Sequence, residues 1–300
     1  MAIRPLMLLA ATMIAGCGGS SIESDDANPA ATRAISIPFA AFAGDTQIDC
    51  DASLGHLGIH GASAQLSDFK LFIHNVRLVT DEGVEVPLTL DEVTGWQTDG
   101  IALLDFQNRG DSCNAVDEKP VNTSIHGRVP EQPLVYSGVR FTVGVPVSHN
   151  HNDSAMSVAP LNVAAMFWSW RGGYKHMRFD VRPLNGVDLA SGATSAVWQF
   201  HLGDTDCSAD PIGHCNYRNR PEIALDGFIE NEIRVLIDYA ALVQSSDLNS
   251  DAGGPSGCMS GTGDPECVDL FDQLGLILGD GEGPASAQTV FSIELAPGPL

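Results

Sequence analysis

The chain has few basic residues and little helical periodicity, and it contains none of the common catalytic motifs. Lysine and arginine number 15 against 38 aspartates and glutamates, which gives a formal net charge of −23 at pH 7. Such a surface opposes binding to nucleic acids or anionic membranes. No Gly-x-Ser-x-Gly elbow, His-Glu-x-x-His helix, Walker loop or Cys-x-x-Cys-His haem site occurs. We therefore do not expect an enzyme, and a hydrolase built on His151 and Asp153 is the least favoured interpretation.

The N-terminus has the pattern of an export signal. Arg4 precedes an apolar run from Leu6 to Ile14, which is too short to span a membrane. Ile14-Ala15-Gly16-Cys17 has the form of a bacterial lipoprotein cleavage site, although an ordinary signal peptide with an incidental Cys17 is the alternative. Residues 1–16 are expected to be a lipoprotein signal peptide and residues 17–34 a flexible tether. The protein is then lipid-anchored through Cys17 to a bacterial membrane, with no other membrane contact, facing the periplasm or exterior.

Seven cysteines are present, and without Cys17 six remain. An even number in an exported chain is typical of disulfides, and no Cys-x-x-Cys motif supports a thiolate metal cluster instead. Proximity in the sequence and elimination favour the pairs Cys207 with Cys215, Cys258 with Cys267, and Cys50 with Cys113.

Alternation of apolar and polar residues predicts many short strands. They are expected near residues 35–42, 69–79, 101–106, 139–145, 177–182, 198–202, 233–237 and 290–295. Between Ile73 and Val76 the apolar phase shifts, which predicts a bulge at His74 and Asn75. The predicted fold is all-β, a β-sandwich with long disulfide-stapled loops, formed as one domain by residues 35–300.

One acidic, Gly-rich loop precedes the one convincing helical segment, residues 268–278. Its residues Asp247, Asn249 and Asp251 resemble the first half of a calcium loop, but Cys258 stands where a carboxylate would be required. Calcium is therefore a weaker interpretation than a polar, turn-rich loop.

Trp168 and Trp170 are separated by one serine, so in an extended segment both indoles would lie on one face. A pair of core aromatics is the simpler interpretation of this spacing. Nine histidines offer nitrogen ligands. His201 lies on the strand face opposite Phe200 and its apolar neighbours, and His151 lies in a loop before the tryptophan segment.

Together these features resemble the MbnP family, a member of a paired copper-homeostasis system called the metallo-mystery pair. The resemblance extends from about residue 35 to the C-terminus and includes Trp168-Ser169-Trp170, Phe200-His201-Leu202-Gly203 and Asn219-Arg220-Pro221. The other segments that carry it are residues 68–79, 96–106, 144–146 with 150–151, 160–163, 174–175, Cys207, 257–260 and 264–267.

The resemblance implies an extracytoplasmic protein that binds one copper(I) ion. It also implies that the first tryptophan of the pair, here Trp168, is oxidised to kynurenine by a partner dihaem enzyme of the MauG or cytochrome c peroxidase type. An indole N–H offers no lone pair, whereas the aromatic amine of kynurenine can ligate. Neutral nitrogen ligands suit a soft, monovalent ion.

Two histidines, His151 and His201, are the expected further ligands. Second-tier candidates are His74, His56, Met166, as a thioether ligand or a packing residue, and Trp170, as a relay. His176 departs from the family pattern and could add a surface ligand or alter partner docking. The alternative function is a surface lipoprotein that binds a glycan or protein on a tryptophan stacking platform.

Overall fold

A computed structural model describes residues 31–210, 212–280 and 287–296. The described residues after Ala31 belong to one compact unit, Thr32–Leu300. The expected signal peptide, Cys17 and nearly all of the tether lie outside the described residues. None of the described helices is long and apolar enough to cross a membrane.

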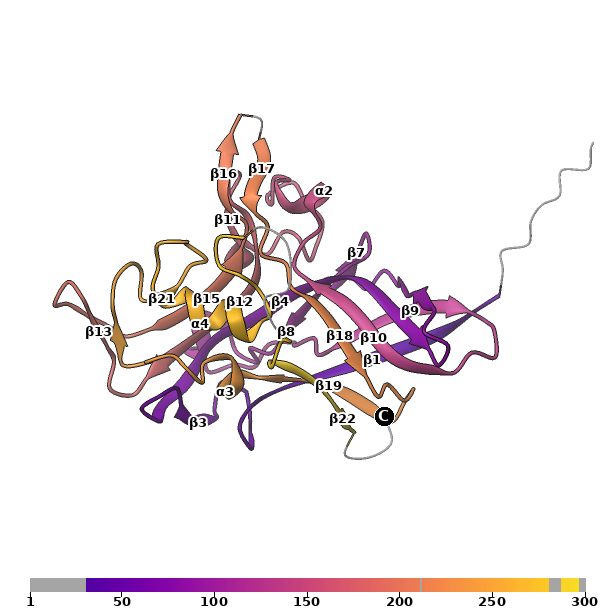
Figure 1. The fold of residues 1–300 in the computed structure, drawn as a ribbon, viewed down its shortest axis with the longest axis horizontal. Coiled ribbons are helices and arrows are strands. Elements are labelled where there is room, and N and C mark those ends of the chain that lie inside the picture. Colours follow the sequence, from indigo (N-terminus) through magenta and orange to yellow (C-terminus); the bar gives the residue numbers. More distant parts are fainter. Residues whose placement is uncertain (1–30, 211, 281–286, 297–300) are drawn as a thin grey trace, which may run out of the picture. The chain divides into compact units, whose positions relative to one another are not determined.

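Two large sheets dominate the described part of the chain (Figure 1). The six-stranded sheet consists of β22 (Phe291–Leu295), β19 (Ile233–Asp238), β1 (Thr32–Ala43), β9 (Ser124–Pro130) and β6 (Thr89–Leu90), with β2 (Thr46–Gln47) paired to β1. The eleven-stranded sheet has the central order β18 (Glu222–Asp226), β10 (Tyr136–Val143), β4 (Ala62–Thr80), β12 (Gly173–Pro183), β15 (Trp198–Gly203) and β21 (Gly257–Cys258). Its remaining strands are β3 (Ser53–Leu57), β5 (Glu85–Pro87), β7 (Gln97–Thr98), β8 (Ile101–Asp105) and β11 (Phe167–Ser169).

Smaller elements decorate these sheets. They are the hairpin β16 (Thr205–Ala209) and β17 (Ile212–Tyr217), and the small sheet β14 (Thr194–Ser195), β13 (Val187–Leu189) and β20 (Ser250–Asp251). The helical turns are α1 (Gly110–Cys113), α2 (Val147–Asn150), η1 (Ala164–Met166), α3 (Tyr239–Leu242) and α4 (Cys267–Gln273). The all-β prediction is confirmed, because strands make up most of the regular structure.

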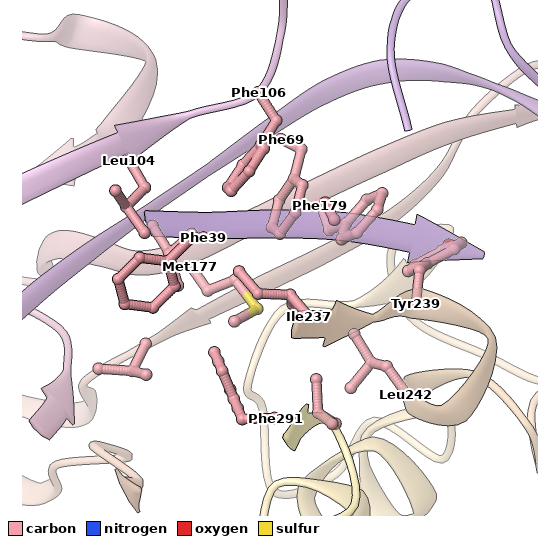
Figure 2. Packing of buried hydrophobic residues seen from close by; sticks show 14 of the residues in the cluster. Phe39, Phe69, Leu104, Phe106, Met177, Phe179, Ile237, Tyr239, Leu242 and Phe291 are labelled. Atoms are coloured by element: carbon pink, nitrogen blue, oxygen red, sulfur yellow. The ribbon is translucent and has the colours of Figure 1, made fainter. Parts of the chain in front are cut away.

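The apolar alternation in the sequence builds a core between the two large sheets. Phe39 of β1 meets Phe141 of β10 edge-on, with ring centroids 5.7 Å apart. Phe179 of β12 stacks between Phe69 and Tyr239, with centroid distances of 3.9 and 3.8 Å. Figure 2 shows four of these side chains in one cluster: Phe39, Phe69, Phe179 and Tyr239. Burial of so much apolar surface is the main stabilising contribution to the sandwich.

The predicted bulge is present in β4. Thr142 pairs with His74 and Arg140 with Arg77, so the register shifts between them, and Asn75 has a φ of 53°. Asparagine tolerates this left-handed conformation better than most residues do.

Two boundaries differ from the prediction. β1 begins at Thr32 because residues 32–34 pair with residues 128–130 of β9, so three residues of the expected tether belong to the fold. The helix expected over residues 268–278 ends at Gln273, since Gly275 has a φ of 73° and terminates it.

All three expected disulfides are formed: Cys50 with Cys113, Cys207 with Cys215, and Cys258 with Cys267. The second closes the β16–β17 hairpin, and the third fastens the loop that carries β21 to α4.

Candidate metal site

The outer face of the large sheet, turned away from the main core, carries a second and smaller core. Leu71 and Ile73 of β4 belong to the main core, whereas Phe72 between them points the other way. Around Phe72 pack the remaining buried members: Ile101, Leu103, Val145, Leu161, Met166 and Tyr174. The segment from η1 through β11 is therefore held over the outer face, and this positions the tryptophan pair.

Trp168 is half-buried and packs directly on the backbone of β15. A Cβ atom on Gly203 would lie 2.5 Å from Cζ3 and 2.9 Å from Cη2 of the Trp168 ring, so only glycine leaves room for the indole. The pairing of Phe167 with Tyr174 and of Ser169 with Gly173 fixes β11 beside β12. The glycine of the Phe200–Gly203 motif thus has a packing reason, which is to admit the Trp168 ring.

His201 shares this face with the Trp168 ring. It stands two residues before Gly203 on β15, and side chains two apart in a strand point to the same side. Only 5 % of His201 is exposed, and its Nε2 lies 2.9 Å from Oδ1 of Asp180. Burial lowers the pKa of His201, although the Asp180 carboxylate opposes the shift, so the imidazole is neutral at pH 7. A neutral imidazole can act as a metal ligand.

The edge of β15 that does not pair with β12 is held by the segment around Cys258. β21 pairs with it at Phe200 and Cys258, and the Ser260 hydroxyl donates to the carbonyl of His201 over 2.8 Å. The amide of Gly203 donates in turn to Ser260 Oγ over 3.2 Å. The Cys258 loop therefore holds the backbone on which both His201 and the Trp168 ring depend.

His151 directly follows α2, and its side chain lies against β17 of the β16–β17 hairpin. Its Nδ1 is 3.2 Å from the carbonyl oxygen of Trp170, and its Nε2 is 3.3 Å from the Asn150 amide nitrogen and 3.5 Å from Cys215 Sγ. A Cβ on Gly213 would touch its ring at 3.3 Å, and Figure 1 shows α2 beside this hairpin.

Among the described residues, one group of three metal-ligating side chains has its ligand atoms within 4.8 Å: His151, Asp204 and Cys215. This group is not a thiolate site, because Cys215 is bonded to Cys207. Its carboxylate is also occupied, since Asp204 Oδ2 accepts from Asn150 and Arg220 over 3.0 Å each. Of the three, His151 is the one that is neither disulfide-bonded nor ion-paired, although both of its ring nitrogens have hydrogen-bond partners.

Asp204 is the centre of a buried polar network that sequence reasoning missed. Its Oδ1 lies 2.8 Å from His176 Nε2 and 2.8 Å from Arg220 Nη1. The available signals were its position directly after the Phe200–Gly203 motif and the occurrence of Asn150 and Arg220 in other family segments. The network ties the loop of His151 to the end of β15.

The expectation that His176 offers a surface ligand is wrong, because His176 is fully buried. Its Nε2 lies near Asp204, and Val145 donates to its Nδ1 over 3.4 Å. A register shift between Lys175 and Met177 interrupts the alternation of β12 at this position. Both ring nitrogens are therefore engaged within the fold.

The second-tier candidates lie in four different surroundings. His74 places Nδ1 2.8 Å from the carbonyl of Gly144, and burial lowers its pKa to about 4. Met166 is fully buried in the second core. Trp170 lies in the turn after β11, is 50 % exposed, and has the guanidinium of Arg171 5.5 Å from its ring.

His56 lies apart from the Trp168 neighbourhood. Strand β3 pairs with residues 62–65 of β4, whereas the row of His201 runs through Arg178 to Lys70. These positions are roughly 20 Å apart along the strand at about 3.3 Å per residue. The structure thus brings Trp168 and His201 to one face and His151 to its border, but it does not bring His56 there.

The acidic loop uses its oxygens internally. Asn249 donates its amide to Asp247, and Gly253 and Gly257 donate theirs to Asp251. Calcium in this loop stays a prediction from the sequence alone.

The fold and this site define a disulfide-stapled β-sandwich that carries a tryptophan and a histidine on the outer face of its large sheet. The profile of the MbnP family matches residues 32–260, and the chain therefore belongs to that family. A solved structure, MbnP from Methylosinus trichosporium, is 30 % identical, with a TM-score of 0.82 over 89 % of this chain and 99 % of that chain. None of the curated proteins compared with the chain matches it.

Proposed function

We propose that this protein binds copper(I) outside the cytoplasm, at a site that is completed when a partner dihaem enzyme of the MauG type oxidises Trp168 to kynurenine. The observation that carries the proposal is the placement of the Trp168 ring on Gly203, on the same face of β15 as His201. Membership of the MbnP family supports it. The protein itself would be a binding protein for copper homeostasis and not an enzyme.

The chemistry of the conversion fits the way the ring is held. Cleavage of the Cγ–Cδ1 bond places one oxygen atom on each of the two carbons, a four-electron oxidation that consumes one dioxygen, or two hydrogen peroxide molecules with release of two waters. Hydrolysis of the resulting formamide then releases Cδ1 as formate. The indole nitrogen becomes an aromatic amine with a lone pair, which the indole lacks. Cζ3 and Cη2, the atoms in contact with Gly203, belong to the six-membered ring that survives. The modified side chain can therefore keep its six-membered ring packed on Gly203 while its nitrogen becomes a metal ligand.

His201 is the first partner that we assign to this amine, and His151 is the second. Both are histidines at the border of the Trp168 segment, and His201 is neutral because burial lowers its pKa. Uncharged nitrogen ligands add no negative charge, which favours a soft monovalent ion over divalent ions that prefer carboxylates. The lipid anchor at Cys17 would hold this site at a membrane surface, and calcium in the acidic loop is not needed for it.

Substitution of Trp168 by phenylalanine tests the proposal directly. Full-length protein co-produced with the dihaem enzyme is expected to lose its high-affinity copper(I) site in the Trp168→Phe variant, measured by competition with a chromophoric copper(I) chelator. Trp170→Phe, which keeps Trp168, is the matched comparison and should retain the site; loss of kynurenine at position 168 in this variant would assign the relay role to Trp170. Full affinity in Trp168→Phe would contradict the kynurenine mechanism for this chain.

One observation favours a second function, a surface module that stacks a glycan or a protein ligand on Trp170. This indole is 50 % exposed, which is unusual for so large an apolar side chain. Tryptophan fluorescence separates the two functions, because a glycan platform responds to sugars and not to copper(I). Loss of the sugar response in Trp170→Ala would assign it to this ring.

A further inference from the structure

The outer face of the large sheet carries a row of buried charges that ends at His201. The row consists of Asp180, Arg178, Asp68, Lys70 and Asp105, which we call the charged row. Its members alternate in sign and come from three adjacent strands, β12, β4 and β8. The three aspartates and Lys70 are each no more than 5 % exposed.

Each member of the charged row contacts the next. Arg178 Nη2 lies 2.7 Å from Asp180 Oδ2, and Arg178 Nη1 lies 2.9 Å from Asp68 Oδ2. Lys70 bonds Asp68 Oδ1 and lies 3.6 Å from Asp105 Oδ1. At the other end of the row, Lys119 Nζ forms an ion pair with Asp105 Oδ2 at a distance of 2.7 Å. Every carboxylate is therefore bonded to a cation.

Buried ion pairs contribute little net stability, because desolvation offsets most of the attraction. Asp180, the member of the charged row next to His201, has a more specific role, which is its contact with the His201 ring. Asp180 Oδ1 faces His201 Nε2 at 2.9 Å, while Oδ2 accepts from Arg178 and, at 3.4 Å, from Gln199. Arg178 donates to Oδ2 from both Nε and Nη2, over 2.7 Å each, and this paired guanidinium keeps the Asp180 carboxylate ionised. An ionised carboxylate only accepts, so Nε2 of His201 must carry the proton.

We infer that Asp180 is a positioning residue that holds His201 in its Nε2–H tautomer and leaves Nδ1 as the nitrogen offered to the bound ion. The inference rests on the proposed function for the identity of that ion. Among the described residues, no other hydrogen bond involves the His201 ring, so Nδ1 has an unused lone pair. A carboxylate behind a ligating histidine fixes both its tautomer and its ring orientation.

The substitution Asp180→Asn separates this role from a structural one. The oxygen of the new amide must occupy the place of Oδ2, because Arg178 and Gln199 both donate there. The NH₂ group then faces His201 and donates to Nε2, which moves the ring proton to Nδ1 and removes the ligand lone pair. The variant is isosteric, so its effect comes from hydrogen-bond polarity and charge.

The experiment is nitrogen-15 NMR of the ring nitrogens in metal-free, full-length protein labelled at histidine, with His201→Gln to assign the signal. The expected result is the Nε2–H tautomer in the wild type and the Nδ1–H tautomer in Asp180→Asn. The matched control is Asp68→Asn, which removes the next carboxylate of the row, on the far side of Arg178, and should leave the His201 tautomer unchanged. An Nδ1–H tautomer in the wild type overturns the inference even if no variant folds, and so does an unchanged tautomer in folded Asp180→Asn.

Copper(I) affinity is the second readout. Loss of an outer partner of a metal ligand typically costs about 10- to 100-fold in affinity, and we expect this loss in Asp180→Asn but not in Asp68→Asn. If the tautomers behave as expected but the kynurenine-containing wild type binds no copper(I), the proposed function fails while the positioning of His201 by Asp180 stands. Because the tautomer is measured without metal, the two failures are distinguishable.

Discussion

The two faces of the large sheet use alternate residues of the same strands, yet they are held together in opposite ways. On β12, Phe179 points into the main core and the next residue, Asp180, points into the charged row. On β15, Phe200 and His201 divide in the same manner. The inner face is stabilised by apolar burial, which is largely indifferent to direction. The outer face buries polar groups with specific partners, and it is there that the candidate metal site lies.

Deletion of a ring from the inner face should have the largest effect on stability. Phe179 stacks on Phe69 and Tyr239, and Figure 2 shows it inside the packed cluster. Phe179→Ala is expected to lower the free energy of unfolding by about 3–5 kcal/mol, since it leaves a cavity. Urea denaturation followed by circular dichroism measures this. Trp170→Ala removes an exposed aromatic and should change stability by no more than about 0.5 kcal/mol; equal losses would contradict the assignment of the core.

On the outer face, we expect the largest loss of stability from removing a buried charge, whereas on the inner face it comes from removing the volume of a side chain. Asp204→Asn keeps the shape of the side chain but leaves the largely buried Arg220 without its carboxylate. Breaking a buried pair in this way typically costs about 3–5 kcal/mol, and we expect about 3 kcal/mol by the same denaturation assay. Asp226→Asn is the control, because that carboxylate pairs with Arg140 at the exposed surface and should cost less than about 1 kcal/mol. Similar values for the two variants would show that the Asp204 network is not buried.

A substitution that fills the space beside the Trp168 ring tests the packing of that ring on β15. Gly203→Ala places a methyl group 2.5 Å from Cζ3 of the ring, so the indole must move, at a cost of up to about 3 kcal/mol in unfolding free energy. Its fluorescence and copper(I) affinity should change together. Gly172→Ala is the matched control, because its methyl group would meet Trp168 only at ordinary contact distances of 3.5–3.6 Å. An unchanged Gly203→Ala protein would mean that the ring does not lie on β15.

The smallest expected effect is the contribution of the buried His74 to the pH dependence of the free energy of unfolding. Burial lowers the pKa of His74 to about 4, from 6.5 in the unfolded chain. Between these values the unfolded state binds more protons, so stability falls as the pH decreases from about 6.5 to 4. At pH 5 the loss is roughly 2 kcal/mol relative to pH 7.5. The wild type is compared with His74→Gln, in which this component of the pH slope should vanish; parallel slopes would contradict the burial of His74.

The sequence predicts the inner face far better than the outer one. Strands β4, β10, β12, β15 and β19 follow from alternation, and the bulge after His74 follows from a break in that alternation. On the outer face the same rule places Asp68, Lys70 and Asp180 in solvent, although the structure buries them. A period of two shows on which side a residue lies, but it cannot show whether another segment covers that side.

The candidate site divides in the same way. His201 and Trp168 could be selected from the sequence through the family segments that contain them, and the structure places both on one face. Asp180, Asp204 and Gly203 could not be assigned their contacts, because their partners lie on different elements. His176 was misplaced because a register shift in β12 breaks the alternation there. Contacts between distant segments are the part that required coordinates.

Peptide mass spectrometry across residues 167–171, with metal analysis of the same sample, tests the central claim most directly. The protein is purified from its native host under conditions in which the proposed partner, a dihaem enzyme, is active. We expect kynurenine at position 168 together with near-stoichiometric copper. Unmodified Trp168 without copper in that sample would contradict the account and favour the binding-module function.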